Sequence, residues 1–409
     1  MKVCQINCIY GSGSTGKIVK DVHKTLVDNG IESIVIAPVM PSDCKSEKGV
    51  YCISSYILNR TSAIYRRFTG RQFDGGFIET NRILNILKRE KPDIVHLHCI
   101  NGNNINVYRL YDYLSKNHIK TILTLHANFP FTGGCGHSYD CEQWVTGCKK
   151  CPILKEATQS WFFDGTARTW RKQMACYQKF ETDNLYITAV SPWLLERSKR
   201  SPMLSRFKSC VVMNGVDTNV FKPRESNWRE KLGILDNEKM LFHATASFNP
   251  YGDNLKGGKY IVQLAEVLKD QGYKIVVAAN NGKVERLPSN VIYLGRTKTQ
   301  IELAELYSAA DLTIITSKLE TFSMPVAESL CCGTPVVGFE AGGPESIALK
   351  DFSEFVEYGS IDALTNVVTK WSEKRLDATE VASIAKKSYS KEVMTNNFMD
   401  LYNECFCIS

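Results

Sequence analysis

Residues Glu320–Ser346 read ETFSMPVAESLCCGTPVVGFEAGGPES, and this stretch decides the fold. Two carboxylates, Glu320 and Glu328, stand eight residues apart with a proline turn between them. After them we expect a short apolar helix, a glycine–proline break, the strand Val336–Phe339 and a Gly-Gly loop. Upstream, Leu312–Ile315 has the branched apolar composition of a buried strand. The pattern predicts an α/β unit made of a strand, a carboxylate-bearing loop, a helix, a strand and a glycine loop.

The predicted unit offers a site for a particular kind of ligand. Open parallel sheets bind ligands at the carboxyl ends of their strands, where the loop and the helix N-terminus would lie. Backbone N–H groups at a helix N-terminus attract phosphate. Carboxylates such as Glu320 and Glu328 accept hydrogen bonds from neutral donors such as sugar hydroxyls. Amides for phosphate and carboxylates for hydroxyls together suit a sugar nucleotide.

The segment resembles the donor-site signature of retaining glycosyltransferases of family 4, of the bacterial surface-polysaccharide type. The match consists of Glu-x7-Glu, the Gly-Thr-Pro-Val-Val run at 333–337 and the Gly-Gly loop at 342–343. The alternative is an ordinary helix with two solvated glutamates, but it would not explain why glycine and proline residues stand at each strand end. The resemblance implies an α/β protein of the GT-B fold, with two Rossmann-like domains facing a central cleft and a C-terminal helix that crosses back to the first domain.

The resemblance also implies roles within the donor site. Glu320 would orient the sugar ring, and Glu328 would bind the ribose. The loop between them would supply further donor contacts, from Thr321, Phe322, Ser323 and Met324. The implied reaction moves a sugar from a nucleotide sugar, UDP- or GDP-linked, to a glycan or lipid-linked acceptor. It requires no cofactor for catalysis.

The rest of the chain fits two such domains. Its 409 residues suggest two or three domains, and strands alternate with helices in both halves, which predicts parallel sheets. The turn signals Asn214-Gly215-Val216-Asp217 and Phe221-Lys222-Pro223, which the family shares, place a hinge near 215–225. We expect a first domain at 1–218 with a cysteine-rich insertion at 128–175, a donor domain at 219–390 and the crossing helix at 391–409.

Composition indicates a soluble globular protein. Hydrophobic residues make up 44% and charged residues 23% of the chain, which are ordinary values. No apolar run approaches the roughly 20 residues of a membrane helix. The start, MKVCQINCIY, lacks the apolar region and cleavage site of a signal peptide, and it is typical of a first strand. Fifteen cysteines without a secretion signal indicate a reducing compartment, so we expect a cytoplasmic protein.

A glycine-rich loop, Gly11–Lys17, follows the expected first strand. It matches the dinucleotide fingerprint G-x-G-x-x-G, but the second strand ends in Ala37-Pro38 without a carboxylate for a ribose, which disfavours a dehydrogenase. It nearly matches a phosphate loop, but Ile18 stands where a metal-binding Ser or Thr is needed. Amides at a helix start still suit an anion, although a tight turn alone would also explain the glycines. The resemblance places four residues of this loop near the donor phosphate or the acceptor, namely Gly13, Ser14, Thr15 and Gly16.

Three histidines follow strands of the first half. His126 ends one strand, and the family has a histidine here that faces the donor sugar. A neutral imidazole can donate to a sugar hydroxyl or support charge near the anomeric carbon. The alternative is a buried histidine bonded to the backbone. His96 and His98 alternate on a neighbouring strand and share one face, where we expect structural or acceptor-side roles.

Phosphate neutralisation is the point at which the chain departs from the family pattern. The family carries an Arg after the first strand of the donor domain and a Lys before a glycine, and Lys256 matches the second. Ser247 stands near the expected Arg and brings a hydroxyl without a charge, whereas one such electrostatic contact is worth about 2.7–4 kcal/mol. The insertion at 249–255 is a candidate for a substitute contact. The missing Arg supports the alternative of a non-catalytic sugar-nucleotide or glycan-binding protein on the same scaffold.

A further loop of the expected donor domain lies between a strand and a helix. In the family its backbone reads the nucleobase, so the base leaves no side-chain signature. The residues at this position are Gly295, Arg296 and Thr297. The residues that the resemblance makes catalytic are His126, Glu320 and Lys256.

Four cysteines lie close together in the sequence of the insertion, at Cys135, Cys141, Cys148 and Cys151. The last two have the Cys-x-x-Cys spacing of zinc ligands, but the first pair is looser than usual. In a reducing compartment such a group indicates metal more often than disulfides. We therefore expect either a structural zinc or packed free thiols.

Basic and aromatic residues are interleaved in the stretch 56–91. The basic residues include Arg60, Arg66, Arg67, Arg71 and Arg82, and the aromatic residues are Tyr56, Tyr65, Phe68, Phe73 and Phe77. This mixture suits contact with an anionic lipid surface, which would place the protein at the inner face of the plasma membrane. The alternative is a solvated face. Nucleic acid is disfavoured as a partner, since the pI of about 8.6 lies below 9 and no binding motif is present.

Overall fold

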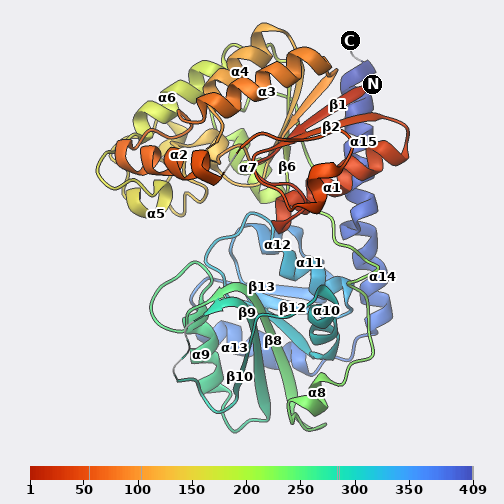
Figure 1. The fold of residues 1–409 in the computed structure, drawn as a ribbon. Coiled ribbons are helices and arrows are strands. Elements are labelled where there is room, and N and C mark those ends of the chain that lie inside the picture. Colours follow the sequence, from red (N-terminus) through yellow and green to blue (C-terminus); the bar gives the residue numbers. More distant parts are fainter. Residues whose placement is uncertain (55, 103, 283, 285, 408–409) are drawn as a thin grey trace. The chain divides into compact units, whose positions relative to one another are not determined.

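The chain divides into two compact units, each a sheet with helices packed against it (Figure 1). The computed structural model describes residues 1–407 except 55, 103, 283 and 285, and only the backbone of 56–59, 281, 282 and 407. Unit 1 contains Met1–Met213 and the chain from Thr395 onward, and unit 2 contains Asn214–Met394. The first division falls between residues 213 and 214, just before the hinge that the sequence predicts near 215–225. The side chain of Tyr56 lies outside the described residues.

Unit 1 is built on a seven-stranded sheet in which neighbouring strands are parallel. Its strands, in the order β3-β2-β1-β4-β5-β6-β7, are Val50–Cys52, Glu32–Ala37, Lys2–Ile6, Ile94–Leu97, Lys120–Leu125, Leu185–Ala189 and Ser209–Val211. The central strands are continuous apolar runs because helices cover both faces of such a sheet. All strand ends that carry chemistry, including that of β5 before His126, therefore lie at one edge.

Seven α-helices accompany this sheet in the described part of unit 1. They are α1 (Gly13–Asp28), α2 (Tyr56–Thr69), α3 (Phe77–Glu90), α4 (Val107–Lys116), α5 (Leu154–Thr158), α6 (Thr166–Tyr177) and α7 (Pro192–Lys199). Side chains cap some of them: Asn106 accepts from the Arg109 backbone before α4, and Ser191 accepts from the Leu194 backbone before α7.

Unit 2 is built on a six-stranded sheet, again with parallel neighbours. Its strands, in the order β10-β9-β8-β11-β12-β13, are Val291–Gly295, Tyr273–Gly282, Lys239–Phe248, Leu312–Ile315, Val336–Phe339 and Ser353–Val356. The strand Val336–Phe339 has its predicted bounds. Two parallel α/β sheets confirm the predicted fold class.

Seven α-helices accompany this sheet in the described part of unit 2. They are α8 (Trp228–Lys231), α9 (Gly258–Val267), α10 (Gln300–Ala309), α11 (Met324–Cys331), α12 (Gly343–Ile347), α13 (Ile361–Ser372) and α14 (Ala378–Tyr389). One element differs from prediction. The residues between Glu320 and Glu328 include the first turn of α11, because Pro325 lacks an N–H and is well suited to a helix start. Glu328 therefore lies on the helix rather than before it.

The last helix, α15 (Lys391–Cys407), begins in unit 2 and ends in unit 1. Its Tyr402 hydroxyl lies 2.6 Å from His96 Nδ1 on β4, and the ring of Phe398 lies 5.0 Å from the His96 ring. The predicted return of the C-terminal helix to the first domain is therefore confirmed. No helix in the described part of the chain combines the length and the apolarity needed to cross a bilayer.

Candidate functional site

The loop after β11 and the loop after β12 are joined at the carboxyl edge of the second sheet. The Glu320 backbone N–H donates to the Ala341 carbonyl at 2.9 Å, and the Gly343 N–H donates to the Glu320 carbonyl at 2.8 Å. A Cβ on Gly343 would lie 2.5 Å from the Phe322 backbone nitrogen, which is too close for any other residue. The Gly-Gly loop of the predicted signature thus holds the backbone of Glu320 in place.

The Glu320 carboxylate pairs with Lys256. Its Oε1 accepts from Lys256 Nζ at 2.9 Å and from Ser317 Oγ at 2.6 Å, and the Glu320 side chain is 13% exposed. Burial opposes ionisation of this carboxyl, but Lys256 and Ser317 outweigh it and hold its pKa below the ordinary value. Two of the residues predicted to be catalytic are therefore brought into one charged, partly buried pair.

Two glycines bring Lys256 to this position. Gly257 has a φ of 65°, and a Cβ there would lie 1.9 Å from the Thr316 carbonyl oxygen at the end of β11. A Cβ on Gly258 would lie 2.3 Å from the Asn249 carbonyl oxygen. The Thr316 hydroxyl also donates to the Lys256 carbonyl at 3.1 Å. The close approach that only glycine permits fixes the Lys256 backbone beside β11.

A histidine that sequence reasoning missed lies next to the pair. His243, on β8, is 2% exposed, and its Nδ1 lies 2.9 Å from the Ile314 carbonyl oxygen, to which it must donate. Burial lowers its pKa to about 4, an effect that the bond to Ile314 opposes and the nearby Lys256 charge reinforces. His243 is therefore neutral at pH 7. Its Nε2 has no hydrogen-bond partner among the described residues.

The N-terminus of α11 carries a hydroxyl that is not satisfied within the protein. Ser323 is the residue before the helix, with the unusual φ of 89°, and it is 3% exposed. Its hydroxyl lies close enough to Glu320 to help lower the pKa of that carboxyl, but not at a geometry that makes a hydrogen bond. The hydroxyl and the first amides of α11 are suited to an anionic ligand. Met324 and Thr321 are partly exposed beside it, whereas Phe322 is buried.

The remaining donor-site candidates of unit 2 follow the same edge of the sheet. Glu328, partly exposed on α11, accepts from the Tyr307 hydroxyl at 3.3 Å. Ser247 is exposed near the end of β8. Gly295, with a φ of 70°, ends β10 and is followed by an exposed Arg296 and a partly exposed Thr297. Because β8, β10 and β11 are parallel, these residues share the carboxyl edge with Glu320.

In unit 1 the glycine loop closes on itself before α1. The Gly11 N–H donates to the Gly16 carbonyl at 3.0 Å, and Asn7 Nδ2 donates to the Thr15 hydroxyl at 3.4 Å. Gly13 has a φ of 65°, and Gly13 and Ser14 are exposed at the helix start. The loop is thus a tight turn that also presents the first amides of a 16-residue helix.

His126 takes part in a chain of hydrogen bonds with His98 and Gln5. Its Nε2 lies 3.2 Å from His98 Nδ1, and His98 Nε2 lies 3.3 Å from Gln5 Oε1. Since Gln5 Nε2 donates to the Val19 carbonyl, Gln5 Oε1 must accept. His98 therefore donates from Nε2 and accepts at Nδ1, so that His126 donates from Nε2.

The chain fixes the tautomer of His126. Burial lowers the pKa of His126 to about 4, and it lowers the pKa of His98 well below the ordinary value, so both are neutral at pH 7. The single ring proton of His126 is used inside the protein, and Nδ1 can only accept. His96 bonds Tyr402 and the Thr124 hydroxyl, each at 2.6 Å, which makes it structural.

The four cysteines of the insertion lie near one another. Burial and the thiols of Cys151 and Cys141 raise the pKa of Cys135 to about 11, and burial and the thiols of Cys135, Cys141 and Cys151 raise that of Cys148 to about 12. No three His, Cys, Asp or Glu side chains in the described residues are arranged to hold a metal ion. The zinc site that is one of the two expectations for this insertion is therefore not evident in the described residues.

Aromatic and polar contacts help to hold this insertion together. Trp144 is 1% exposed, and the guanidinium of Arg197 lies 5.1 Å from its ring centroid. Asp164 accepts from the Cys151 backbone at 2.7 Å. An aromatic side chain of this size contributes the apolar contact that a small, glycine-rich segment otherwise lacks.

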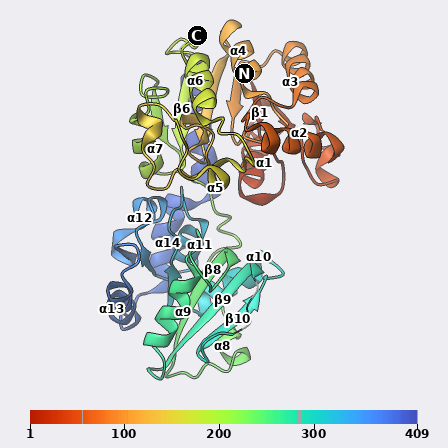
Figure 2. The ribbon, with the colours of Figure 1, turned by 90° about the vertical axis from the view of Figure 1, so that its left-hand side faces the viewer.

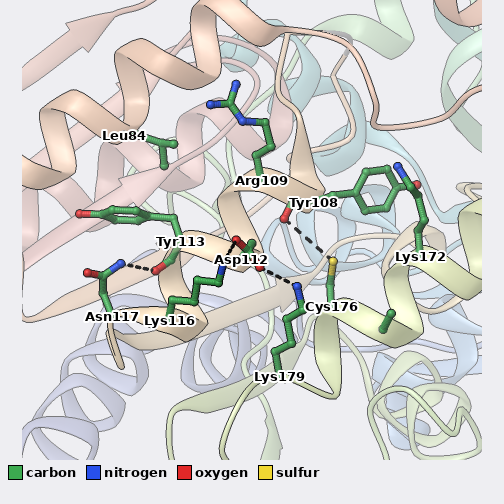
Figure 3. A pocket seen from close by; sticks show the side chains of 11 residues that line it. Leu84, Tyr108, Arg109, Asp112, Tyr113, Lys116, Asn117, Lys172, Cys176 and Lys179 are labelled. Carbon is green, nitrogen blue, oxygen red and sulfur yellow. Dashed lines mark hydrogen bonds and ion pairs between the residues drawn. The ribbon is translucent and has the colours of Figure 1, made fainter.

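A groove of about 500 Å³ lies elsewhere in unit 1, between α3, α4 and α6 (Figure 3). Its lysines already have partners: Lys116 and Lys179 both pair with Asp112, at 2.8 and 2.6 Å, and Lys172 pairs with Asp74 at 3.1 Å. None of the predicted site residues lines this groove. The site candidates gather instead at the strand ends.

Comparison with known proteins identifies the family. Residues 15–220 match the family model described as Glycosyltransferase Family 4, and residues 226–388 match the model described as Glycosyl transferases group 1. The first match spans half of the chain. Together the two matches cover both units and include the strand ends described above.

Relatives and solved structures agree with this match. The chain is 20% identical to the putative colanic acid biosynthesis glycosyl transferase WcaC of Escherichia coli K12, over 98% of this chain and 99% of that protein. It is 27% identical to the N-acetyl-alpha-D-glucosaminyl L-malate synthase of Bacillus anthracis, over 87% and 83%. Anabaena HepE, solved with UDP and glucose, has the same fold, with a TM-score of 0.65, 14% identity and coverage of 99% and 100%. The chain belongs to glycosyltransferase family 4, the retaining enzymes that transfer a sugar from a nucleotide donor.

Proposed function

We propose that the protein transfers a sugar from a UDP- or GDP-linked donor to a glycan or lipid-linked acceptor in the synthesis of a surface polysaccharide. One observation carries the donor assignment. The pair of Lys256 and Glu320 lies at the N-terminus of α11, beside the Ser323 hydroxyl that no described residue satisfies. A cation, a carboxylate and a helix N-terminus with a spare hydroxyl suit a phosphate next to a sugar.

The proposed reaction proceeds on one face of the donor. The bond between the anomeric carbon and the donor phosphate breaks, and the phosphate leaves toward Lys256 and the amides near Phe322 and Ser323. An acceptor hydroxyl forms the new bond from the same side, and its proton passes to the leaving phosphate oxygen. Positive charge and fixed amides stabilise the charge that develops. No step calls for a metal ion.

The other predicted residues are assigned to binding. Glu320 orients the sugar ring and Glu328 binds the ribose, while the backbone of Gly295–Thr297 contacts the base and Ser247 contacts a phosphate. In unit 1 the loop Gly13–Gly16 and His126 contribute further donor contacts. The tautomer of His126 changes the role expected of it. A neutral His126 that donates its Nε2 proton to His98 would not donate that proton to a sugar hydroxyl.

The substrate class rests on relatives. HepE was solved with UDP and glucose, and WcaC is described as a colanic acid biosynthesis enzyme. Surface polysaccharides are built on lipid-linked precursors, and we therefore place the protein in the cytoplasm at the inner face of the plasma membrane.

Two measurements test this function. Thermal-shift assays with a panel of UDP- and GDP-sugars identify the donor, because a ligand that binds the folded state raises the melting temperature. Sugar transfer is then measured for Lys256→Met and for the control Lys259→Met, whose lysine pairs with the exposed Asp253. Donor binding without transfer to any acceptor would favour the non-catalytic alternative.

A further inference from the structure

Large apolar side chains gather on one exposed surface of unit 1. Ile64 and Phe68 on α2 are 57% and 54% exposed, and the loop after α5 adds Trp161, Phe162 and Phe163 at 52%, 66% and 58%. These five residues form what we call the aromatic surface. Both segments belong to the face that is turned to the viewer in Figure 2. Contiguous exposed apolar residues of this size mark interaction sites.

The aromatic surface is firmly built. The Phe68 and Phe162 rings meet edge to face at 5.5 Å, and the backbone N–H of Trp161 donates to the Arg67 carbonyl at 2.8 Å. A Cβ on Gly70 would lie 2.1 Å from the Phe163 carbonyl oxygen, so the loop fits closely against the end of α2. The exposure of these side chains is therefore imposed by the fold, because both segments hold each other in place.

The surroundings of the aromatic surface are basic. Helix α2 contains three arginines and no acidic residue. Arg66 and Arg67 donate to the Gln159 side chain at 3.0 and 3.4 Å, which is a neutral partner that leaves their charge uncompensated. In the described part of the chain, no ion pair involves Arg66, Arg67 or Arg71. Arg71 itself is exposed.

We propose that the aromatic surface inserts into an anionic phospholipid surface. Aromatic side chains at the level of the headgroups, with arginines beside them, are the chemistry of interfacial binding. The uncompensated arginines complement anionic headgroups, which neither a neutral glycan nor a neutral lipid would require. The cysteine-rich insertion thus contributes directly to membrane contact through Trp161–Phe163.

The surface is continuous with the edge of the first sheet. Arg66 and Arg71 line a small crevice together with Asn101 and Gly102, which follow the carboxyl end of β4. His126 follows the neighbouring strand β5. A lipid-linked acceptor held in the bilayer would have its phosphate near these two guanidinium groups. This last step rests on the proposed function, whereas binding to the bilayer does not.

Vesicle flotation of the full-length protein tests the proposal. Phosphatidylcholine vesicles are compared with vesicles that also contain phosphatidylglycerol. The variants are Phe162→Ser/Phe163→Ser for insertion and Arg67→Gln/Arg71→Gln for charge, with Leu235→Ser, a 62% exposed leucine of unit 2, as the control. We expect the wild type and the control to bind anionic vesicles. Each double variant should lose about tenfold or more in partitioning, and the arginine variant should lose the salt dependence.

Two outcomes would overturn the proposal. One is a wild type that binds neither kind of vesicle. The other is a serine variant that binds as the wild type does, which would show that the aromatic residues serve a soluble glycan or a protein. The melting temperature and the thermal shift with a nucleotide sugar are measured for every variant. These values should not change, and a protein that binds vesicles but no sugar nucleotide would refute the proposed function while sustaining the membrane surface.

Discussion

Lys256 Nζ and Glu320 Oε1 lie 2.9 Å apart although 64 residues separate them in the chain. The pair depends on the order of the second sheet, in which β8 and β11 are neighbours and their following loops meet. It also places the positively charged, flexible side chain of Lys256 at the point where a donor phosphate would depart. Most of the expected behaviour of the enzyme follows from this contact.

Removing the cation should slow the chemical step. Lys256→Met takes away the charge that we propose stabilises the leaving phosphate, and we expect kcat to fall by about 10²–10³-fold. Lys259→Met, three residues later on α9, is the matched control and should keep its activity. Steady-state kinetics with the donor found by thermal shift decide. Equal kcat values for the two variants would remove Lys256 from the mechanism.

Substitution of Glu328 should change nucleotide binding, whereas substitution of Glu320 should change kcat. Glu328→Ala should weaken nucleotide binding by about 10–150-fold, since it removes a charged acceptor worth about 1.5–3 kcal/mol. Glu320→Ala should mainly lower kcat, because the proposed role of Glu320 is to orient the reacting sugar. Calorimetry and kinetics give the two constants, and Glu266→Ala, exposed on α9, is the control. Near-normal values in both variants would contradict the donor-site assignment.

Acid should destabilise the protein through its buried histidines. The folded-state pKa of His243 is about 4, below its ordinary value of 6.5, so the unfolded state binds more protons between these values. Stability is therefore complete above about pH 6.5 and falls as the pH drops toward 4, by about 1.4 kcal/mol at one unit below 6.5. Melting temperatures from pH 7.5 to 5 should decrease less steeply in His243→Gln. The surface variant His118→Gln should keep the wild-type slope.

The tautomer of His126 can be observed directly. Nitrogen-15 spectra of the histidine side chains should show a protonated Nε2 and an unprotonated Nδ1 for His126 at pH 7. His98→Phe removes the acceptor, and a mixture of tautomers should appear, with a lower kcat/KM. A spectrum in which His126 carries its proton on Nδ1 would reverse the assignment.

The fold was predictable where an apolar run is bounded at both ends by glycine or proline residues. Val336–Phe339 is a branched apolar run bounded by Gly333-Thr334-Pro335 and by a glycine loop, and it is a strand with those bounds. Helix α2 was not predicted, since its arginines and aromatic residues show no clear start or stop signal. Its side chains are ordered instead by the distant loop Trp161–Phe163, which no local pattern reveals.

The candidate site was predictable as a set of residues but not as a set of contacts. The signature identified Glu320 and Lys256 separately, while their pairing required the strand order. His243 is not part of a recognisable motif, because a single histidine in an apolar strand resembles an ordinary residue of the hydrophobic core. The cysteines show the opposite case. Their spacing resembles that of zinc ligands, yet no three such side chains in the described residues are arranged to hold a metal ion.

The contact between His96 and Tyr402 has a consequence for biosynthesis. The first sheet receives a side chain that the ribosome adds 306 positions after its partner. Until that late segment emerges, the nascent chain holds an open apolar seam where Phe398 and Tyr402 will dock. Unit 1 is therefore the first to begin folding and the last to finish, and the period between these two events is when it is most exposed to aggregation and to chaperones.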